Sequence, residues 1–226
     1  MVFSSVDSFM EPRFNVLCSI FYSLIRVRGK KNAGMYFSHD LPLFFPLSTA
    51  IQHASGRSVP WKTRCVLLYW LSVVLLNPYQ FDESTLPVLT SLPSAVHPWV
   101  LHDDPLGEMG AYFLAVLFSR RFFPESLLPH TFQTLVDDAL VSLRSYDEQP
   151  LLPLLRMLAH FAKLAPTPRF LATLPAITPL AQESPRSARA TDLLMKLLYR
   201  CARHCLRLVY QTAGIDPLWA FRLFSQ

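Results

Sequence analysis

The chain has 226 residues, of which 51% are hydrophobic and 16% charged, and 21 Lys and Arg against 16 Asp and Glu give a net charge of +5. Soluble domains are typically about 25% charged, and disordered chains combine low hydrophobicity with high net charge. The composition therefore predicts a folded chain with a large core. The sequence has 19 Pro and 6 Gly and no glycine-rich phosphate loop, which excludes the common nucleotide-binding folds.

The longest apolar run and the cysteines indicate the compartment. Residues 65–76 are apolar but end before Pro78, and a transmembrane helix needs about 20 such residues. The N-terminal sequence lacks the basic start and long apolar stretch of a secretory signal. Four scattered cysteines favour reduced thiols over a disulfide framework. We therefore expect a cytoplasmic protein without a transmembrane segment.

Helical periodicity dominates the sequence. It predicts helices at residues 15–28, 61–76, 107–122, 129–144, 151–164 and 188–213. The apolar side of the first is predicted to consist of Val16, Leu17, Ile20, Leu24 and Val27. The proline-rich segments at residues 86–105 and 166–185 are predicted to be connections, the first with at most one short helix.

These elements predict an all-α fold. No segment shows sustained alternation of period two, and no Asn-Gly or Asp-Gly hairpin turn occurs. Helices of about 15 residues joined by proline-bearing turns favour antiparallel helix pairs in a HEAT- or armadillo-like α-solenoid. We expect a single repeat domain over residues 1–226. An irregular helical bundle is the alternative, because no exact internal repeat is visible.

Two basic clusters are candidate binding surfaces. On the last predicted helix a basic stripe of Arg189, Lys196, Arg200, Arg203 and Arg207 lies opposite the apolar residues Leu194, Leu197, Leu198, Cys201, Cys205 and Leu208. An acidic partner would complement this stripe, and an ordinary solvated face is the alternative. An anionic membrane is a weaker candidate. We expect no nucleic acid, because no aromatic residues interleave with the arginines.

The second cluster ends the first predicted helix and consists of Arg26, Arg28, Lys30 and Lys31. Cations at this position complement the negative end of the helix dipole, and this structural role accounts for most of the cluster.

No group of residues predicts catalysis or a metal site. Cys201, His204 and Cys205 lie within one turn, but structural zinc needs four ligands, and buried thiols are the better interpretation. The His-Asp-Asp run at residues 102–104 precedes Gly107, where acidic residues suit a helix N-terminus. No Gly-x-Ser-x-Gly nucleophile motif occurs. We expect a protein that is not an enzyme and has no metal or cofactor.

Several stretches carry a family resemblance. Residues 22–31 (YSLIRVRGKK) and 36–40 (YFSHD) resemble the "vRGyK…FFPHE" region of the tubulin-folding cofactor D (tubulin-specific chaperone D) family. Residues 61–72 (WKTRCVLLYWLS) are similar to its "WETRYxLLLWLS" helix, and residues 77–81 (NPYQF) stand where the family has "IPFDF". Residues 115–120 (AVLFSR) resemble its "AVLVSR" helix. The resemblance is strongest over residues 15–120.

The resemblance implies a function. Members of this family are helical-repeat chaperones that bind β-tubulin, which is acidic. With cofactors C and E and an Arf-like small GTPase they assemble and take apart the αβ-tubulin dimer, and some are described as GTPase activators. These proteins are the implied partners, and a cytoplasmic or cytoskeleton-associated location is the implied one. Members are several times longer, so we expect a fragment of a longer solenoid, a truncated product or a reduced paralogue.

The alternative is a degenerate or truncated helical-repeat scaffold for protein–protein interaction, without tubulin activity. Among the residues that match the family, Trp61 and Trp70 are expected to pack in cores. Arg64 is the polar residue whose role packing does not explain, and it is predicted to bridge to a neighbouring repeat or to contact a partner. The partner-binding candidates are Arg28, Lys31, Arg64, Lys196, Arg200, Arg203 and Arg207.

Overall fold

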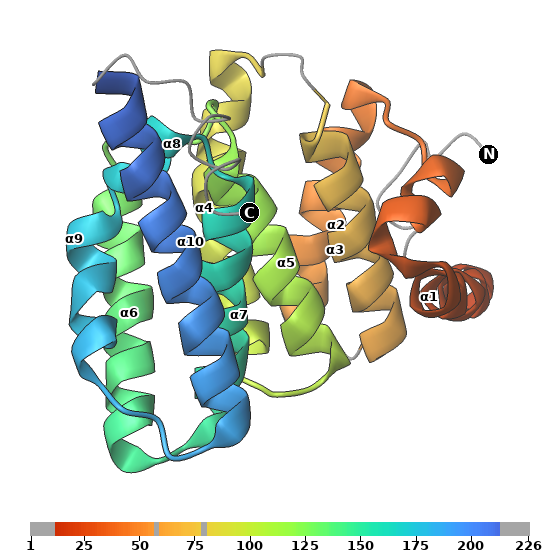
Figure 1. Ribbon diagram of the computed structural model, residues 1–226. Helices are drawn as coiled ribbons and strands as arrows, with labels where there is room; N and C mark the ends of the chain where they lie inside the picture. Colours follow the sequence, from red (N-terminus) through yellow and green to blue (C-terminus); the bar gives the residue numbers. More distant parts are fainter. Residues whose placement is uncertain (1–11, 57–58, 78–80, 213–226) are drawn as a thin grey trace. The chain divides into compact units, whose positions relative to one another are not determined.

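The computed structural model describes residues 12–56, 59–77 and 81–212 (Figure 1). Every regular element among these residues is a helix, which confirms the predicted all-α fold. None of these described helices is both long enough and apolar enough to span a membrane. The chain divides into two compact units, Met1–Phe123 and Pro124–Gln226, and the single repeat domain over residues 1–226 stays a prediction.

The first unit is built around one apolar helix. Its helices are α1 (Pro12–Ala33), α2 (Phe44–Gly56), α3 (Trp61–Leu75), α4 (Leu86–Val100) and α5 (Pro105–Ser119), with short 3-10 turns at Gly34–Tyr36, Leu41–Leu43 and Glu83–Thr85. α3 packs against α1, α2 and α5, and α4 packs against α2 and α5. Because α3 is apolar almost all round, it needs neighbours on several sides.

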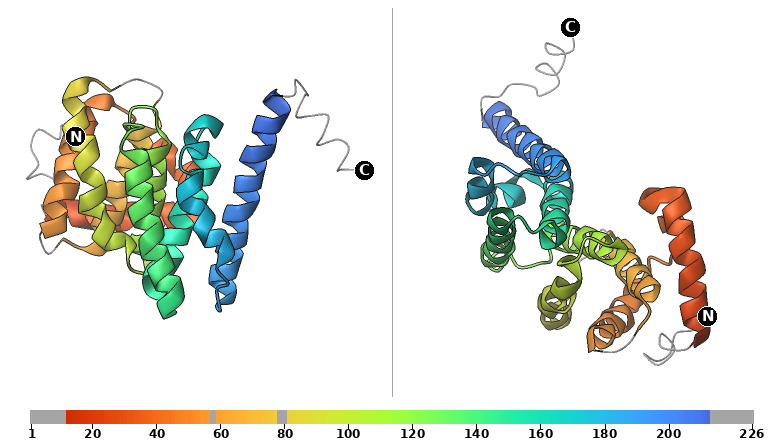
Figure 2. Two further views of the ribbon diagram at one scale, coloured as in Figure 1. Left: turned by 90° about the vertical axis from the view of Figure 1, so that its left-hand side faces the viewer. Right: turned by 90° about the horizontal axis from the view of Figure 1, so that it is seen from below.

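The second unit has the same kind of packing. Its helices are α6 (Leu128–Ser145), α7 (Glu148–Leu164), α8 (Thr167–Leu171), α9 (Leu174–Ile177) and α10 (Ala188–Thr212), with a 3-10 turn at Thr178–Gln182. α7 packs against both α6 and α10, and Figures 1 and 2 show α10 alongside α7. The predicted connection at residues 166–185 therefore contains short helices.

Consecutive helices form antiparallel pairs, as the solenoid prediction requires. α2 packs against α3, α4 against α5, and α6 against α7. In the last pair the turn is very tight, because Tyr146 adopts a left-handed conformation with φ 59°. The next residue, Asp147, caps α7 by accepting a hydrogen bond from the Gln149 backbone N–H at 3.1 Å.

The prediction of a connection with at most one short helix over residues 86–105 is wrong. α4 fills most of this segment, with Pro87 in its first turn and Pro93 and Pro98 inside it. A proline in the first turn costs no hydrogen bond, whereas an interior proline costs about 3 kcal/mol. Leu92 and Val96, each fully buried, belong to the apolar side that offsets this cost. Packing therefore overrides the local preference.

α2 is a further helix that was not predicted. Pro46 lies in its first turn, and the buried residues Leu47, Ala50, Ile51 and Ala54 have the i, i+3, i+4, i+7 spacing of an amphipathic helix. The signal was therefore present in the sequence.

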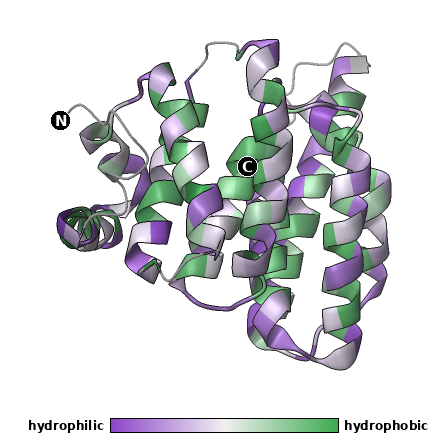
Figure 3. Ribbon diagram, turned by 180° about the vertical axis from the view of Figure 1, so that it is seen from behind, coloured by the Kyte–Doolittle hydropathy of each residue, from purple (hydrophilic) through white to green (hydrophobic). Residues whose placement is uncertain are grey.

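The predicted apolar side of the first helix is wrong as well. α1 buries Phe14, Cys18, Tyr22 and Ile25, whereas Val27 is 83% exposed and Val16 and Ile20 are also exposed. In Figure 3 α1 is viewed along its axis, with hydrophobic and hydrophilic residues around its rim. Both sets recur at helical spacing, so periodicity cannot choose between them. The side with the two aromatic rings buries more apolar area.

The helical state of residues 86–100 gives a testable prediction. Leu92→Ala should lower the free energy of unfolding by about 2–5 kcal/mol, because it leaves a cavity against α2 and α5. Leu86→Ala, at the exposed start of the same helix, should change it by less than about 1 kcal/mol. Urea denaturation followed by circular dichroism measures both. Equal, small effects would contradict the packed helix.

Candidate partner-binding surfaces

The predicted binding residues fall on both units. Arg28 and Lys31 lie near the end of α1 and Arg64 on the first turn of α3, whereas Lys196, Arg200, Arg203 and Arg207 lie on α10. They therefore belong to two separate surfaces.

A kink at Gly29 sets the direction of the last turn of α1, which carries Lys30 and Lys31. Gly29 interrupts α1 with φ 76° and ψ 153°, a backbone conformation that is essentially restricted to glycine. A Cβ atom at this position would meet nothing within 4 Å, so backbone conformation and not crowding requires the glycine. Just after the kink, the Tyr69 hydroxyl on α3 donates a hydrogen bond to the Lys30 carbonyl oxygen, which fixes the last turn of α1.

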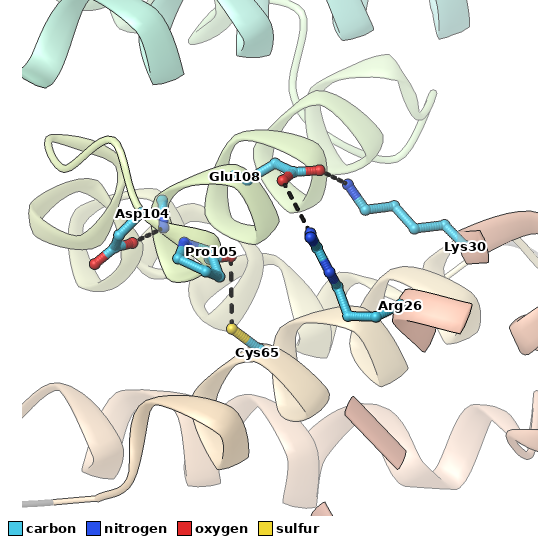
Figure 4. Close-up of polar contacts among 7 residues, drawn as sticks. Arg26, Lys30, Cys65, Asp104, Pro105 and Glu108 are labelled. Atoms are coloured by element: carbon cyan, nitrogen blue, oxygen red, sulfur yellow. Dashed lines mark hydrogen bonds and ion pairs between the residues drawn. The ribbon is translucent and has the colours of Figure 1, made fainter. Parts of the chain in front are cut away.

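The kink brings Lys30 to the first turn of α5 (Figure 4). Its Nζ lies 3.0 Å from Glu108 Oε1, and Arg26 Nη1 lies 3.7 Å from Glu108 Oε2. Lys30 Nζ also lies 4.9 Å from the centroid of the Tyr112 ring. Nearby, Asp104 caps α5 by accepting a hydrogen bond from the Gly107 N–H at 2.7 Å. This confirms the predicted helix-terminal role for Asp104 of the run at residues 102–104.

A cavity of about 310 Å³ lies between α1 and the start of α5. Arg26, Lys30 and Glu108 line it together with apolar residues that include Ile25 and Met109. Because Glu108 carries one negative charge and pairs with both cations, it compensates about half of their charge within the unit. Arg28 and Lys31, the two predicted binding residues, are instead exposed to solvent.

Arg64 contacts a neighbouring helix. Its Cζ lies 5.3 Å from the centroid of the Trp99 ring on α4, a cation–π contact. α3 and α4 belong to consecutive helix pairs, so this contact is of the bridging kind that the sequence analysis considered. A contact of Arg64 with a partner stays a prediction.

The residues that match the family largely contact one another. Trp70 Nε1–H donates to the Ser38 carbonyl oxygen at 3.0 Å, and the Asn77 side-chain amide donates to the His39 carbonyl oxygen at 3.1 Å. The Phe37 ring packs edge-on against the Trp70 ring at a centroid distance of 5.7 Å. These matched stretches therefore hold the first unit together. Residues 78–80 of the matched NPYQF segment lie outside the described residues.

Trp61 differs from its prediction. It is 44% exposed and packs edge-on against the Tyr22 ring on α1 at 4.9 Å. The prediction that it packs in a core is wrong, because it begins α3 at the edge of the helix layer. Trp70, the other predicted core residue, is partly buried.

α10 buries half of its predicted apolar face. Leu194, Leu197 and Cys201 are buried, and Leu198 and Cys205 are partly buried. Ala190 and His204, which were not among the predicted residues, are buried as well. Leu208, which was predicted to lie on this face, is 42% exposed. Arg200 contacts Ala159 and His204 contacts Ala162. Because both residue numbers increase together, α7 and α10 run parallel. Leu208, one turn after His204, therefore lies beyond the end of α7.

The basic stripe divides into two parts. Lys196 Nζ forms an exposed ion pair with Asp192 Oδ2 at 2.5 Å. One turn further on, Arg200 Nη1 donates to the Ala159 carbonyl oxygen on α7, and burial lowers the pKa of Arg200. Arg203 and Arg207 continue the stripe and are exposed. The structure thus gathers three of the four predicted residues at the end of α7.

Two residues of this surface were not predicted. Lys163 in the last turn of α7 and His204 of α10 line the same hollow as Arg200, Arg203 and Arg207. A lysine near a helix C-terminus has a structural role of its own, so no pattern in the sequence links Lys163 to α10.

The three buried thiols, Cys18, Cys65 and Cys201, are poorly suited to nucleophilic chemistry. Burial raises the pKa of the Cys65 thiol to about 12, and Asp104 and Glu108 raise it further. Burial also raises the pKa of Cys18 to about 12 and that of Cys201 to about 11. Within residues 12–56, 59–77 and 81–212, no group of three or more His, Cys, Asp or Glu side chains could hold a metal ion.

The kink at Gly29 gives a second testable prediction. Gly29→Ala should lower the free energy of unfolding by about 1–3 kcal/mol, because alanine is strained in this backbone conformation. Gly34→Ala is the matched control, since a Cβ there meets its nearest atom, Tyr69 Oη, at an ordinary 3.4 Å. Thermal and urea denaturation measure both variants. A Gly29→Ala protein as stable as the control would show that the kink does not require glycine.

Comparison with known protein families identifies the chain. Residues 4–139 match the family described as tubulin-specific chaperone D-like, ARM repeat. Neither the curated proteins nor the solved structures contain a match. The family match covers more than half of the 226 residues, and the armadillo-type helix pairs of the fold agree with it. The chain therefore belongs to the tubulin-specific chaperone D-like ARM-repeat family.

Proposed function

We propose that the chain binds β-tubulin and takes part in assembly and disassembly of the αβ-tubulin heterodimer. The family match over residues 4–139 is the observation that supports this proposal. Cofactors C and E and an Arf-like small GTPase are the further partners, the cytoplasm or cytoskeleton is the location, and any GTPase-activating role belongs to the full cofactor assembly. The chain itself acts by binding and not as an enzyme.

The charge of the second unit supports an acidic partner. Lys163, Arg200, Arg203 and Arg207 gather around one hollow, and His204 beside them is buried. The acidic surface of tubulin would complement this cluster, and such complementarity speeds encounter and fixes orientation. In the first unit Glu108 pairs with Arg26 and Lys30, and Arg28 and Lys31 are exposed basic residues outside this ion-pair network.

Size-exclusion co-elution of the purified chain with αβ-tubulin tests the proposal. We expect co-elution at low salt that weakens at high salt, because exposed charges are screened. Circular dichroism must show that the sample is helical. A helical sample that elutes alone at both salt concentrations would contradict tubulin binding and favour the scaffold alternative.

Two matched double variants identify the surface. Arg203→Gln/Arg207→Gln and Arg28→Gln/Lys31→Gln each remove two exposed positive charges, one pair from each unit. We expect the first to weaken tubulin binding about tenfold and the second less than about threefold. Equal losses would assign the binding to net charge alone. A larger loss from the second variant would place the binding surface on the first unit.

A further inference from the structure

The hollow at the end of α7 has the properties of a ligand site. Its volume is about 260 Å³, and its lining consists of Ala162, Lys163, Arg200, Arg203, His204 and Arg207. Four of these side chains are cationic and none of these lining residues is acidic. We call this hollow the basic pocket.

Its floor is fixed by hydrogen bonds. His204 is 3% exposed, with Nε2 at 2.8 Å from the Ala162 carbonyl oxygen and Nδ1 at 3.1 Å from the Thr167 hydroxyl. Because a carbonyl oxygen only accepts, Nε2 carries the proton, and the Thr167 hydroxyl donates to Nδ1 of the neutral ring. The Phe170 ring stacks on the His204 ring at a centroid distance of 4.4 Å. The floor of the basic pocket is therefore rigid.

The cations repel one another. Burial lowers the pKa of His204, and Arg207 and Arg203 lower it further. Arg203 also adds to the effect of burial in lowering the pKa of Arg200. Complementing the dipole of α7 explains Lys163, and Arg200 of α10 donates a hydrogen bond to the Ala159 carbonyl oxygen of α7. Neither of these roles accounts for Arg203 and Arg207. An anion in the basic pocket would relieve this repulsion.

We propose that the basic pocket binds the carboxylate side chains of an acidic peptide segment of a partner protein. The forked guanidinium groups of Arg203 and Arg207 can each hold a carboxylate through two hydrogen bonds. Small-molecule sites usually measure about 300–1,000 Å³, so a hollow of about 260 Å³ fits the ends of one or two side chains better than a nucleotide.

This inference deepens the proposed function by naming the chemistry that the partner presents. Tubulin as that partner rests on the proposed function, whereas the preference of the basic pocket for acidic peptides can be tested without tubulin.

The test uses fluorescence anisotropy of a labelled oligoglutamate peptide with the full chain. Arg203→Gln/Arg207→Gln removes two charges from the basic pocket, and we expect it to weaken binding about tenfold. Arg189→Gln/Lys196→Gln is the matched control, because it removes two charges from the same stripe of α10 outside the basic pocket. We expect it to weaken binding less than about twofold. Equal losses would mean that only net charge attracts the peptide and would overturn the proposal.

Two further binding measurements test whether the basic pocket prefers other anions to the peptide. Inorganic phosphate, and vesicles of phosphatidylserine and phosphatidylcholine, are each tested as ligands for the same variants. If either depends on Arg203 and Arg207 while the peptide does not bind, the proposal is overturned. We expect the peptide to bind and to be displaced by phosphate only at much higher phosphate concentration.

His204 provides a readout inside the basic pocket. Arg203, Arg207, Arg200 and Lys163 are the charged groups that line the hollow with it. Bound carboxylates offset these charges, so the His204 pKa followed by NMR should rise when the peptide binds. Because the pKa of His204 is higher in the peptide-bound state than in the free state, peptide affinity should increase as the pH falls through this pKa. An unchanged His204 pKa at saturating peptide would overturn the proposed location.

The peptide and tubulin experiments can fail separately. Peptide binding in the basic pocket without tubulin co-elution would leave this inference standing and contradict the proposed function. Tubulin co-elution without peptide binding would contradict this inference alone.

Discussion

The structure of the first unit depends on one constraint. α3 is apolar almost all round, so neighbouring helices must cover most of its surface. Its residues from Cys65 to Tyr69 are all buried, and α1, α2 and α5 contact it. Covering α3 brings the end of α1 close to α5, and the kink at Gly29 then places Lys30 beside Glu108. The basic cluster of α1 is thus drawn into an ion-pair network by the need to bury an apolar helix.

In the second unit the burial of an apolar helix, α7, produces a surface whose positive charge is not balanced by an acidic residue of the pocket lining. α7 is covered by α6 on one side and α10 on another. Because α7 and α10 run parallel and α7 ends first, the last turns of α10 extend past its partner. Arg203 and Arg207 project there around the end of α7, where they meet Lys163 but no acidic residue of the pocket lining. In the first unit Glu108 offsets part of the charge of the basic cluster on α1, whereas no acidic residue lines the hollow beside Arg203 and Arg207 in the second.

The positions of most helices could be predicted from the sequence, whereas the residues that each helix buries were predicted less well. α3, α5, α6, α7 and α10 lie close to their predicted ranges because their apolar periodicity is long and uninterrupted. α4 was missed because the cost of Pro93 and Pro98 is local, whereas the burial that offsets it comes from α2 and α5. Which side of α1 is buried depends on which of its aromatic rings pack against α3, and the sequence of α1 alone does not determine this. For the same reason Arg200, Arg203 and Arg207 could be predicted from one helix, but Lys163 and the floor formed by His204 could not.

The central claim is that this chain binds its partner through the basic surface where α10 passes the end of α7. Hydrogen–deuterium exchange of the full chain with and without αβ-tubulin tests it most directly. We predict slower exchange on tubulin binding in the last turn of α7 and the second half of α10, with the rest of the described chain unchanged. Slower exchange confined to α1 and α3, or no change under conditions in which tubulin co-elutes, would contradict the account.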